Sequence, residues 1–154
     1  MKKNTSAVFA LALALAAIAS PASAMSGKKA GSCVMTPADG IKWTDVPDFP
    51  GVSMAVLEGD PSKGAGHFLI KLKDGFAAPL HHHSSDHFVT VLSGTLSLTV
   101  DGAETKLPAG SYFQFKGKKQ HITKCEPGGD CVLSVDTRGK WDVVPEAGAT
   151  STKH

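Results

Sequence analysis

The chain has 154 residues, with 16 lysines and arginines against 14 acidic residues and a formal net charge of +2. Nucleic-acid binding depends on neutralising phosphates with lysine and arginine, so this near-neutral balance gives no reason to expect a nucleic-acid partner. The same balance offers no long-range attraction to an anionic membrane.

The first 24 residues have the pattern of a cleavable signal peptide. Lys2 and Lys3 give the positive start, residues 7–19 form an apolar run of mostly alanine and leucine, and residues 22–24 offer a small-residue cleavage site. An uncleaved anchor helix is the alternative, but a bilayer span needs roughly 17 to 25 apolar residues and this run is shorter. We therefore expect a periplasmic or secreted protein without stable membrane association after cleavage.

Cleavage would leave residues 25–154, a formally neutral chain of the size of one domain. Residues 25–40 are small, polar and aperiodic, which is typical of a flexible lead-in. Residues 41–145 carry the folded domain, and residues 146–154 are expected to form a disordered tail.

The sequence pattern of residues 41–145 predicts an all-β domain. Short runs rich in β-branched and aromatic residues alternate with glycine, proline and aspartate, as in a sandwich or barrel, and no helical period of useful length is present. Asp101-Gly102 between two apolar runs is a strong signal for a tight hairpin. The expected strands are 42–46, 52–58, 67–72, 78–83, 87–92, 96–100, 104–107, 111–115, 121–125 and 131–137.

Three cysteines are present, so at most one disulfide can form within the chain. Cys125 and Cys131 flank a turn-rich stretch that could bring two strand ends together, and an oxidising compartment favours pairing. Two reduced, partly buried thiols are the alternative, and the sequence does not decide between them. Cys33, in the flexible N-terminal stretch, is the expected odd thiol. A lipoprotein would need this cysteine directly behind the apolar run, but Lys28, Lys29 and small polar residues intervene.

Five of the seven histidines gather in the central part of the chain. Alternate residues of a strand point to the same face, so His81 and His83 would share one side while His82 faces the other. A turn after His83 would let His87 return to the same interior point, and His121 on a later strand could close the site. Clustered histidines can also form a solvated loop, so this pattern needs independent support.

The segment from Gly75 to Gly94 resembles the first motif of the cupins. That motif has a glycine, five residues, His-x-His, three or four residues, an acid, six residues and a glycine, and the spacing here matches throughout. His87 stands in the place of the acid. Asp86 lies one position earlier and by alternation should point away, so His87 is the expected ligand.

A second cupin motif is matched by Gly110 and His121. The sequence departs from it in the turn, where Lys116 replaces the usual proline and Lys118 the usual glycine, and Cys125 replaces the usual asparagine. Further runs are similar to exported single-domain cupins and to the cupin domain of zinc-binding anti-sigma factors: 75–81, 90–95, 107–113 and 138–142. The His and Cys module of those factors is missing from this sequence, so we do not expect a sigma-factor partner.

The resemblance implies an all-β, single-domain cupin, a double-stranded β-helix or jelly-roll barrel, that can form a homodimer. It also implies one divalent transition metal, Mn, Fe, Ni, Cu or Zn, held by His81, His83, His87 and His121. Such a centre suits an oxygenase-like enzyme acting on a small anionic or enolisable substrate. The alternative is a non-catalytic protein of the periplasm that binds a metal or small ligand, and the sequence names no catalytic residue.

Overall fold

The structure is a computed structural model that describes residues 33–146. The expected signal peptide and nearly all of the expected tail lie outside the described residues. Residues 36–146 belong to one compact unit. Within the described range, no helix has the length and apolar character that a membrane crossing requires.

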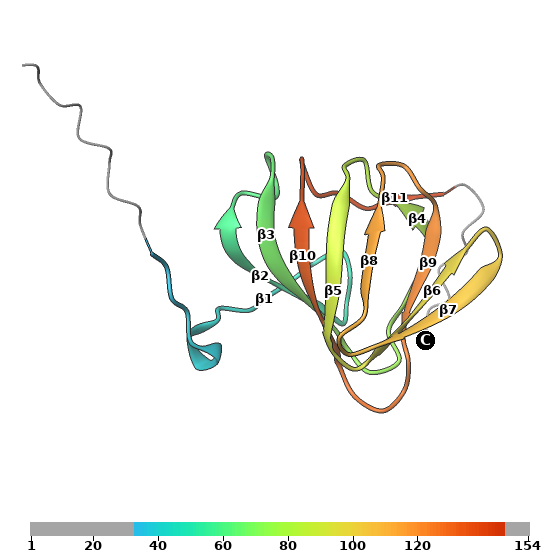
Figure 1. Cartoon of the computed structure of the whole chain (residues 1–154), viewed down its shortest axis with the longest axis horizontal. Coiled ribbons are helices and arrows are strands. Elements are labelled where there is room, and N and C mark those ends of the chain that lie inside the picture. The colour runs from blue at the N-terminus through green and yellow to red at the C-terminus, as the bar shows by residue number, and fades with distance from the viewer. Residues whose placement is uncertain (1–32, 147–154) are drawn as a thin grey trace, which may run out of the picture. The chain divides into compact units, whose positions relative to one another are not determined.

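Two antiparallel sheets face each other in this unit (Figure 1). A short 3-10 turn, η1 (Ala38–Gly40), precedes the strands. The strands are β1 (Thr44–Asp45), β2 (Val52–Gly59), β3 (Gly66–Leu72), β4 (Ala77–His82), β5 (His87–Ser93), β6 (Thr95–Val100), β7 (Ala103–Pro108), β8 (Tyr112–Phe115), β9 (His121–Cys125), β10 (Cys131–Thr137) and β11 (Val144–Pro145). The first sheet has the order β1-β2-β3-β10-β5-β8 and the second β11-β4-β9-β6-β7. This architecture confirms the all-β jelly-roll prediction.

All ten expected strands are present, and β9 and β10 have the predicted bounds. The first expected strand, 42–46, shortens to β1 because only Thr44 and Asp45 pair with β2. β11 was not expected, since its two residues carry no periodicity. It forms because β4 offers a free edge to Val144 and Pro145.

The core lies between the sheets and follows the alternation of side chains. In β5, His87, Val89 and Val91 are buried at every second position, and Leu133 and Val135 of β10 are buried opposite them. Strand pleating places such residues on one face. The hydrophobic core cluster between the sheets consists of twelve buried residues: Phe68, Ile70, Leu72, Val89, Val91, Leu96, Leu98, Phe115, Cys125, Cys131, Leu133 and Val135.

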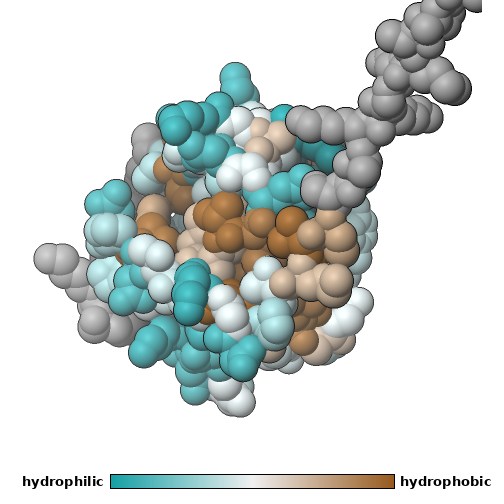
Figure 2. Space-filling view, turned by 90° about the vertical axis from the view of Figure 1, so that its left-hand side faces the viewer, coloured by the Kyte–Doolittle hydropathy of each residue, from teal (hydrophilic) through white to brown (hydrophobic). Residues whose placement is uncertain are grey.

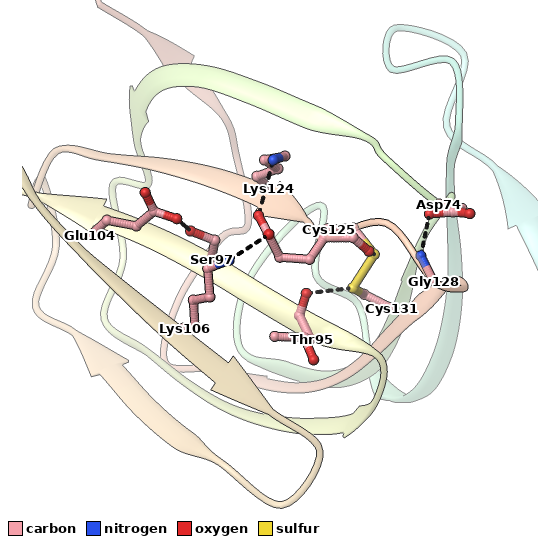
Figure 3. Close-up of polar contacts among 10 residues, drawn as sticks. Asp74, Thr95, Ser97, Glu104, Lys106, Lys124, Cys125, Gly128 and Cys131 are labelled. Atoms are coloured by element: carbon pink, nitrogen blue, oxygen red, sulfur yellow. Dashed lines mark hydrogen bonds and ion pairs between the residues drawn. A yellow bond between two sulfur atoms is a disulfide. The ribbon is translucent and has the colours of Figure 1, made fainter.

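Cys125 and Cys131 form a disulfide (Figure 3). Cys125 ends β9 in one sheet and Cys131 begins β10 in the other, so the bond joins the two sheets. Both cysteines are fully buried, and Cys33 is free and exposed. The geometry therefore decides in favour of the disulfide that the sequence left open.

Gly94 lies directly against this disulfide. It has a positive φ of 75°, and a Cβ at this position would lie 2.9 Å from the Cys131 sulfur. The backbone conformation and the close approach both require glycine, which explains the last glycine of the first motif. The loop between the two cysteines is held by Asp74, whose carboxylate accepts a bond from the Gly128 amide at 3.1 Å (Figure 3).

Reducing the Cys125–Cys131 bond is expected to lower the free energy of unfolding by about 2 kcal/mol, because a short closed loop restricts the unfolded chain. A Cys33→Ala background prevents disulfide exchange, and urea denaturation of the oxidised and reduced forms gives the difference. Equal stability of the two forms would contradict the expected contribution of this link.

Candidate metal centre

Three strands bring four histidines to the same end of the core. His81 lies near the end of β4, His83 follows that strand, His87 begins β5 and His121 begins β9. His81 and His121 are direct cross-strand partners. All four side chains are buried, with exposed fractions of 2–6%. The prediction that these side chains turn inward is confirmed.

Three of these histidines form a tight cluster. Ligand-capable nitrogens of His81, His83 and His121 all lie within 4.8 Å of one another. The ring centroid of His87 is 4.7 Å from that of His83 but 6.4 Å from that of His121. His87 therefore borders the cluster but does not belong to the group whose nitrogens all lie within 4.8 Å of one another. The structure thus brings three of the four expected ligands together.

The Nδ1 atom of every one of these rings lies against a backbone carbonyl. The acceptors for His81, His87 and His121 are the carbonyls of Pro79, Ser85 and Lys119, at 2.7, 3.1 and 2.9 Å. The acceptor for His83 is the carbonyl of Asp142. A carbonyl only accepts, so each Nδ1 must carry the proton, which leaves Nε2 with a free lone pair. Metal-binding histidines are usually oriented in this way, with one ring nitrogen bonded to a carbonyl and the other free for the metal.

Burial keeps these imidazoles neutral. It lowers the pKa of His83 from 6.5 to about 3 and that of His121 to about 4, against an opposing effect of their carbonyl contacts. Burial also lowers the pKa of His81 and of His87. Neutral nitrogen donors suit Mn, Fe, Ni, Cu and Zn much better than Mg or Ca, which prefer oxygen. The residues thus fit the kind of metal that the resemblance implies.

The remaining sequence candidates lie away from the cluster. Asp86 points outward as expected, and its carboxylate accepts bonds from the Gly117 amide and the Lys116 ammonium. His67 bonds to the Ser134 hydroxyl at 2.8 Å, outside the cluster. His82 faces away from the cluster and pairs with Glu146 at 2.5 Å.

Lys118 explains how the second motif tolerates its departure from glycine. It adopts a φ of 68°, the left-handed conformation that glycine adopts without strain. Its amide donates to the His83 carbonyl at 2.8 Å. The turn therefore keeps the backbone shape of the motif although the residue differs.

Sequence reasoning missed the role of Trp141 and Asp142. The Trp141 ring stacks on His83, with centroids 4.0 Å apart and planes 21° from parallel. Burial raises the pKa of Asp142, but bonds from the Ser84 amide and hydroxyl more than offset this and hold the pKa below 3.8. The only signal for these residues was the resemblance over 138–142, since the segment shows no strand pattern.

A cavity of about 250 Å³ adjoins the histidines. Its described lining is almost wholly apolar and contains no lysine or arginine. Thr123 and Asp142 are its polar residues besides the histidines. On the face shown in Figure 2, which is the side along which β2 runs in Figure 1, hydrophobic residues gather in the middle and toward the right, with hydrophilic residues mainly above, to the left and below. The apolar lining residues are Val46, Phe49, Val52, Met54, Ile70, Leu72, Phe76, Ala78, Val89, Leu96, Phe113, Leu133, Val135, Trp141 and Val143.

Both the sequence and the fold are similar to those of known proteins. Residues 68–136 match the model of the Cupin domain family. No curated protein matches the sequence significantly. Many solved structures share the fold.

Three of these structures show the range of similar proteins. The polyketide cyclase RemF from Streptomyces resistomycificus superposes with a TM-score of 0.63 and 16% identity, covering 77% of this chain and 89% of its own. A predicted oxalate decarboxylase from Thermotoga maritima has a TM-score of 0.58 and 18% identity, and the match covers 69% of this chain and 99% of that protein. The structure of the anti-sigma factor ChrR from Rhodobacter sphaeroides, in complex with SigE, has a TM-score of 0.53 and 24% identity. The match covers 66% of this chain and 51% of that chain.

The metal-free protein is expected to lose stability as the pH falls below about 6.5. The unfolded chain takes up protons on His83 and His121 near 6.5, whereas the folded chain does so only near 3 and 4, so acid favours unfolding. Thermal midpoints between pH 7.5 and 4.5 measure the effect. A His83→Asn variant should show a shallower decline, and an unchanged slope would contradict the burial of a neutral ring.

Proposed function

We propose that this chain, whose residues 68–136 match the Cupin domain family, is an exported metal protein with oxygenase-like activity. Its substrate would be a small enolisable organic molecule held in the apolar cavity. The observation that carries the proposal is the convergence of three buried neutral histidines beside a cavity of about 250 Å³.

His81, His83 and His121 would hold one divalent transition metal through Nε2, with His87 as the fourth ligand of the proposed set. Four imidazoles bring no negative charge, so the ion would keep its full positive charge. His87 would have to turn toward the other three, because it lies outside their shared distance. A metal held by three of these histidines would keep coordination positions open for a substrate.

A bound metal would supply a Lewis-acidic position, and with Mn, Fe, Ni or Cu a redox-active one, for an enolate oxygen beside dioxygen. The chain's own residues do the rest. The carbonyl contacts keep each Nε2 unprotonated, and the apolar walls exclude water from the bound molecule. Since no lysine or arginine lines the described cavity, a bound metal would be the main positive charge able to recognise an anionic group.

The cavity also restricts the substrate class. Side chains such as Phe49, Phe76 and Phe113 line it, so most of the ligand should be apolar. A molecule with one enolisable head and an aromatic or aliphatic body fits this lining better than a polyanion. We therefore narrow the expected substrate to mainly apolar enols and phenols.

Export is part of the proposal. The pattern of residues 1–24 supports cleavage of a signal peptide. A buried disulfide between Cys125 and Cys131 is independent support, because such bonds persist in oxidising compartments such as the periplasm.

A non-catalytic binder of metal or small ligand is the second candidate function. The observation in its favour is the scarcity of polar groups in the described cavity, where only Thr123 and Asp142 accompany the histidines. Asp142 is already engaged by Ser84. A catalytic base would then have to come from the histidines or from the substrate itself.

Loss of a ligand should abolish metal binding. His83→Ala and His121→Ala, purified without a histidine tag, are each expected to retain less than about a tenth of the metal that the wild type binds, as measured by elemental analysis. His67→Ala is the matched control, because His67 is a partly buried strand histidine outside the cluster, and it should retain the full amount. Equal metal contents in all three variants would contradict the centre.

Oxygen uptake separates the two functions. Protein loaded with Fe²⁺ is mixed with an aryl 1,3-diketone, and oxygen consumption and ligand binding are both followed. If the protein is an enzyme, we expect oxygen consumption that is lost in His121→Ala and kept in His67→Ala. Binding without any consumption for Fe, Mn, Ni or Cu would favour the non-catalytic alternative.

A further inference from the structure

His83 differs from the other clustered histidines in what holds its ring. The Nδ1 atoms of His81, His87 and His121 each bond to the carbonyl two residues earlier in the chain. The Nδ1 of His83 bonds instead to the carbonyl of Asp142, 59 residues further along. The orientation of His83 therefore depends on a tertiary contact, whereas the other three rings are oriented locally.

Trp141 restrains the same ring from its face. The indole stacks on His83 at 4.0 Å and packs edge-on against Phe68 of the core, with centroids 5.1 Å apart. Its amide donates to the carbonyl of Pro61 at 2.8 Å. The neighbouring residues thus give His83 both a hydrogen-bond acceptor and a flat apolar surface.

The side chain of Asp142 fixes the position of its carbonyl. It accepts two bonds from Ser84, one from the amide at 2.8 Å and one from the hydroxyl at 2.7 Å. Two residues earlier, the Lys140 carbonyl accepts from Ser85 at 2.9 Å. Gly139 allows this approach, since a Cβ there would lie 2.6 Å from the Ser85 hydroxyl.

We name residues 138–146 the C-terminal strap, because they cross the end of β4 that carries the ligands. Val144 pairs with His82 and Pro145 with His81. The Glu146 amide donates to the carbonyl of Leu80 at 3.1 Å. These anchors of the strap fall on the residues that surround His81 and His83, or on the loop at Pro61, and a further one joins the Arg138 amide to the Asp86 carbonyl beside His87.

We propose that Trp141 and Asp142 are positioning residues of the metal centre and that metal binding is coupled to docking of the C-terminal strap. The proposal rests on the metal centre proposed above. His83 can present Nε2 to an ion at no orientational cost only while the strap supplies the Asp142 carbonyl. Binding equilibria are reciprocal, so a bound ion must in turn stabilise the docked strap.

The first test compares two carboxylate variants in the full chain, with Zn²⁺ and Ni²⁺ titrated against a competing chelator. Asp142→Ala removes both bonds to Ser84 and should weaken the affinity for both ions about tenfold. Asp74→Ala is the matched control, because its carboxylate also accepts a backbone amide, that of Gly128 beside the disulfide (Figure 3). The control should stay within about twofold of the wild type, as expected for a site that does not touch the ligands.

The second test needs no variant of the strap. Hydrogen exchange of the wild type is measured with and without Zn²⁺ at the amides of Trp141 and Glu146, which donate to the Pro61 and Leu80 carbonyls. Zinc should slow both by about tenfold or more, in line with the coupling. In His83→Ala this slowing should disappear, which a merely structural role of the strap does not predict.

The possible outcomes distinguish a failure of this proposal from a failure of the proposed metal centre. Equal affinities of Asp142→Ala and Asp74→Ala, or strap amides that do not respond to zinc, would overturn the coupling while a metal-binding wild type keeps the centre. A wild type that binds neither ion would overturn both. Were Asp142→Ala unable to fold, the exchange measurement on the wild type would still decide the coupling.

Discussion

The structure of the site depends on the contact between each imidazole Nδ1 and a backbone carbonyl. A carbonyl can only accept, so it sets the tautomer of the ring and directs Nε2 into the core. Burial then removes the protonated form, as the lowered pKa values of His83 and His121 show. Ligand-capable nitrogens of three such rings lie within 4.8 Å of one another, and neutral nitrogen donors gathered in this way could hold a transition metal.

The scaffold joins its two sheets covalently at one end of β9 and brings the histidines together at the other end. At one end the Cys125–Cys131 bond crosses from β9 to β10. At the other end lies His121, beside His81 of its own sheet and near His87 of the facing sheet. The apolar core fills the space between. A bound ion would add a second link between strands, so the centre would serve stability as well as chemistry.

The cavity and the strap give the site its particular character. The described walls are apolar without lysine or arginine, so a bound metal would be the main site for an anionic group. The strap forms part of that wall through Trp141, Asp142 and Val143. Ligand binding and metal binding would therefore both depend on a segment that lies far from the histidines in the chain.

Local patterns were sufficient to predict much of this protein from its sequence. Alternation and turn residues identified ten strands, because strand side chains repeat every two residues. The same rule placed His81 and His83 inward and His82 outward, and motif spacing added His121. Tertiary structure alone decided that Cys125 and Cys131 pair, that His87 stands slightly apart, and that Trp141 and Asp142 orient His83. These depend on contacts between segments distant in the chain, for which a sequence has no local period.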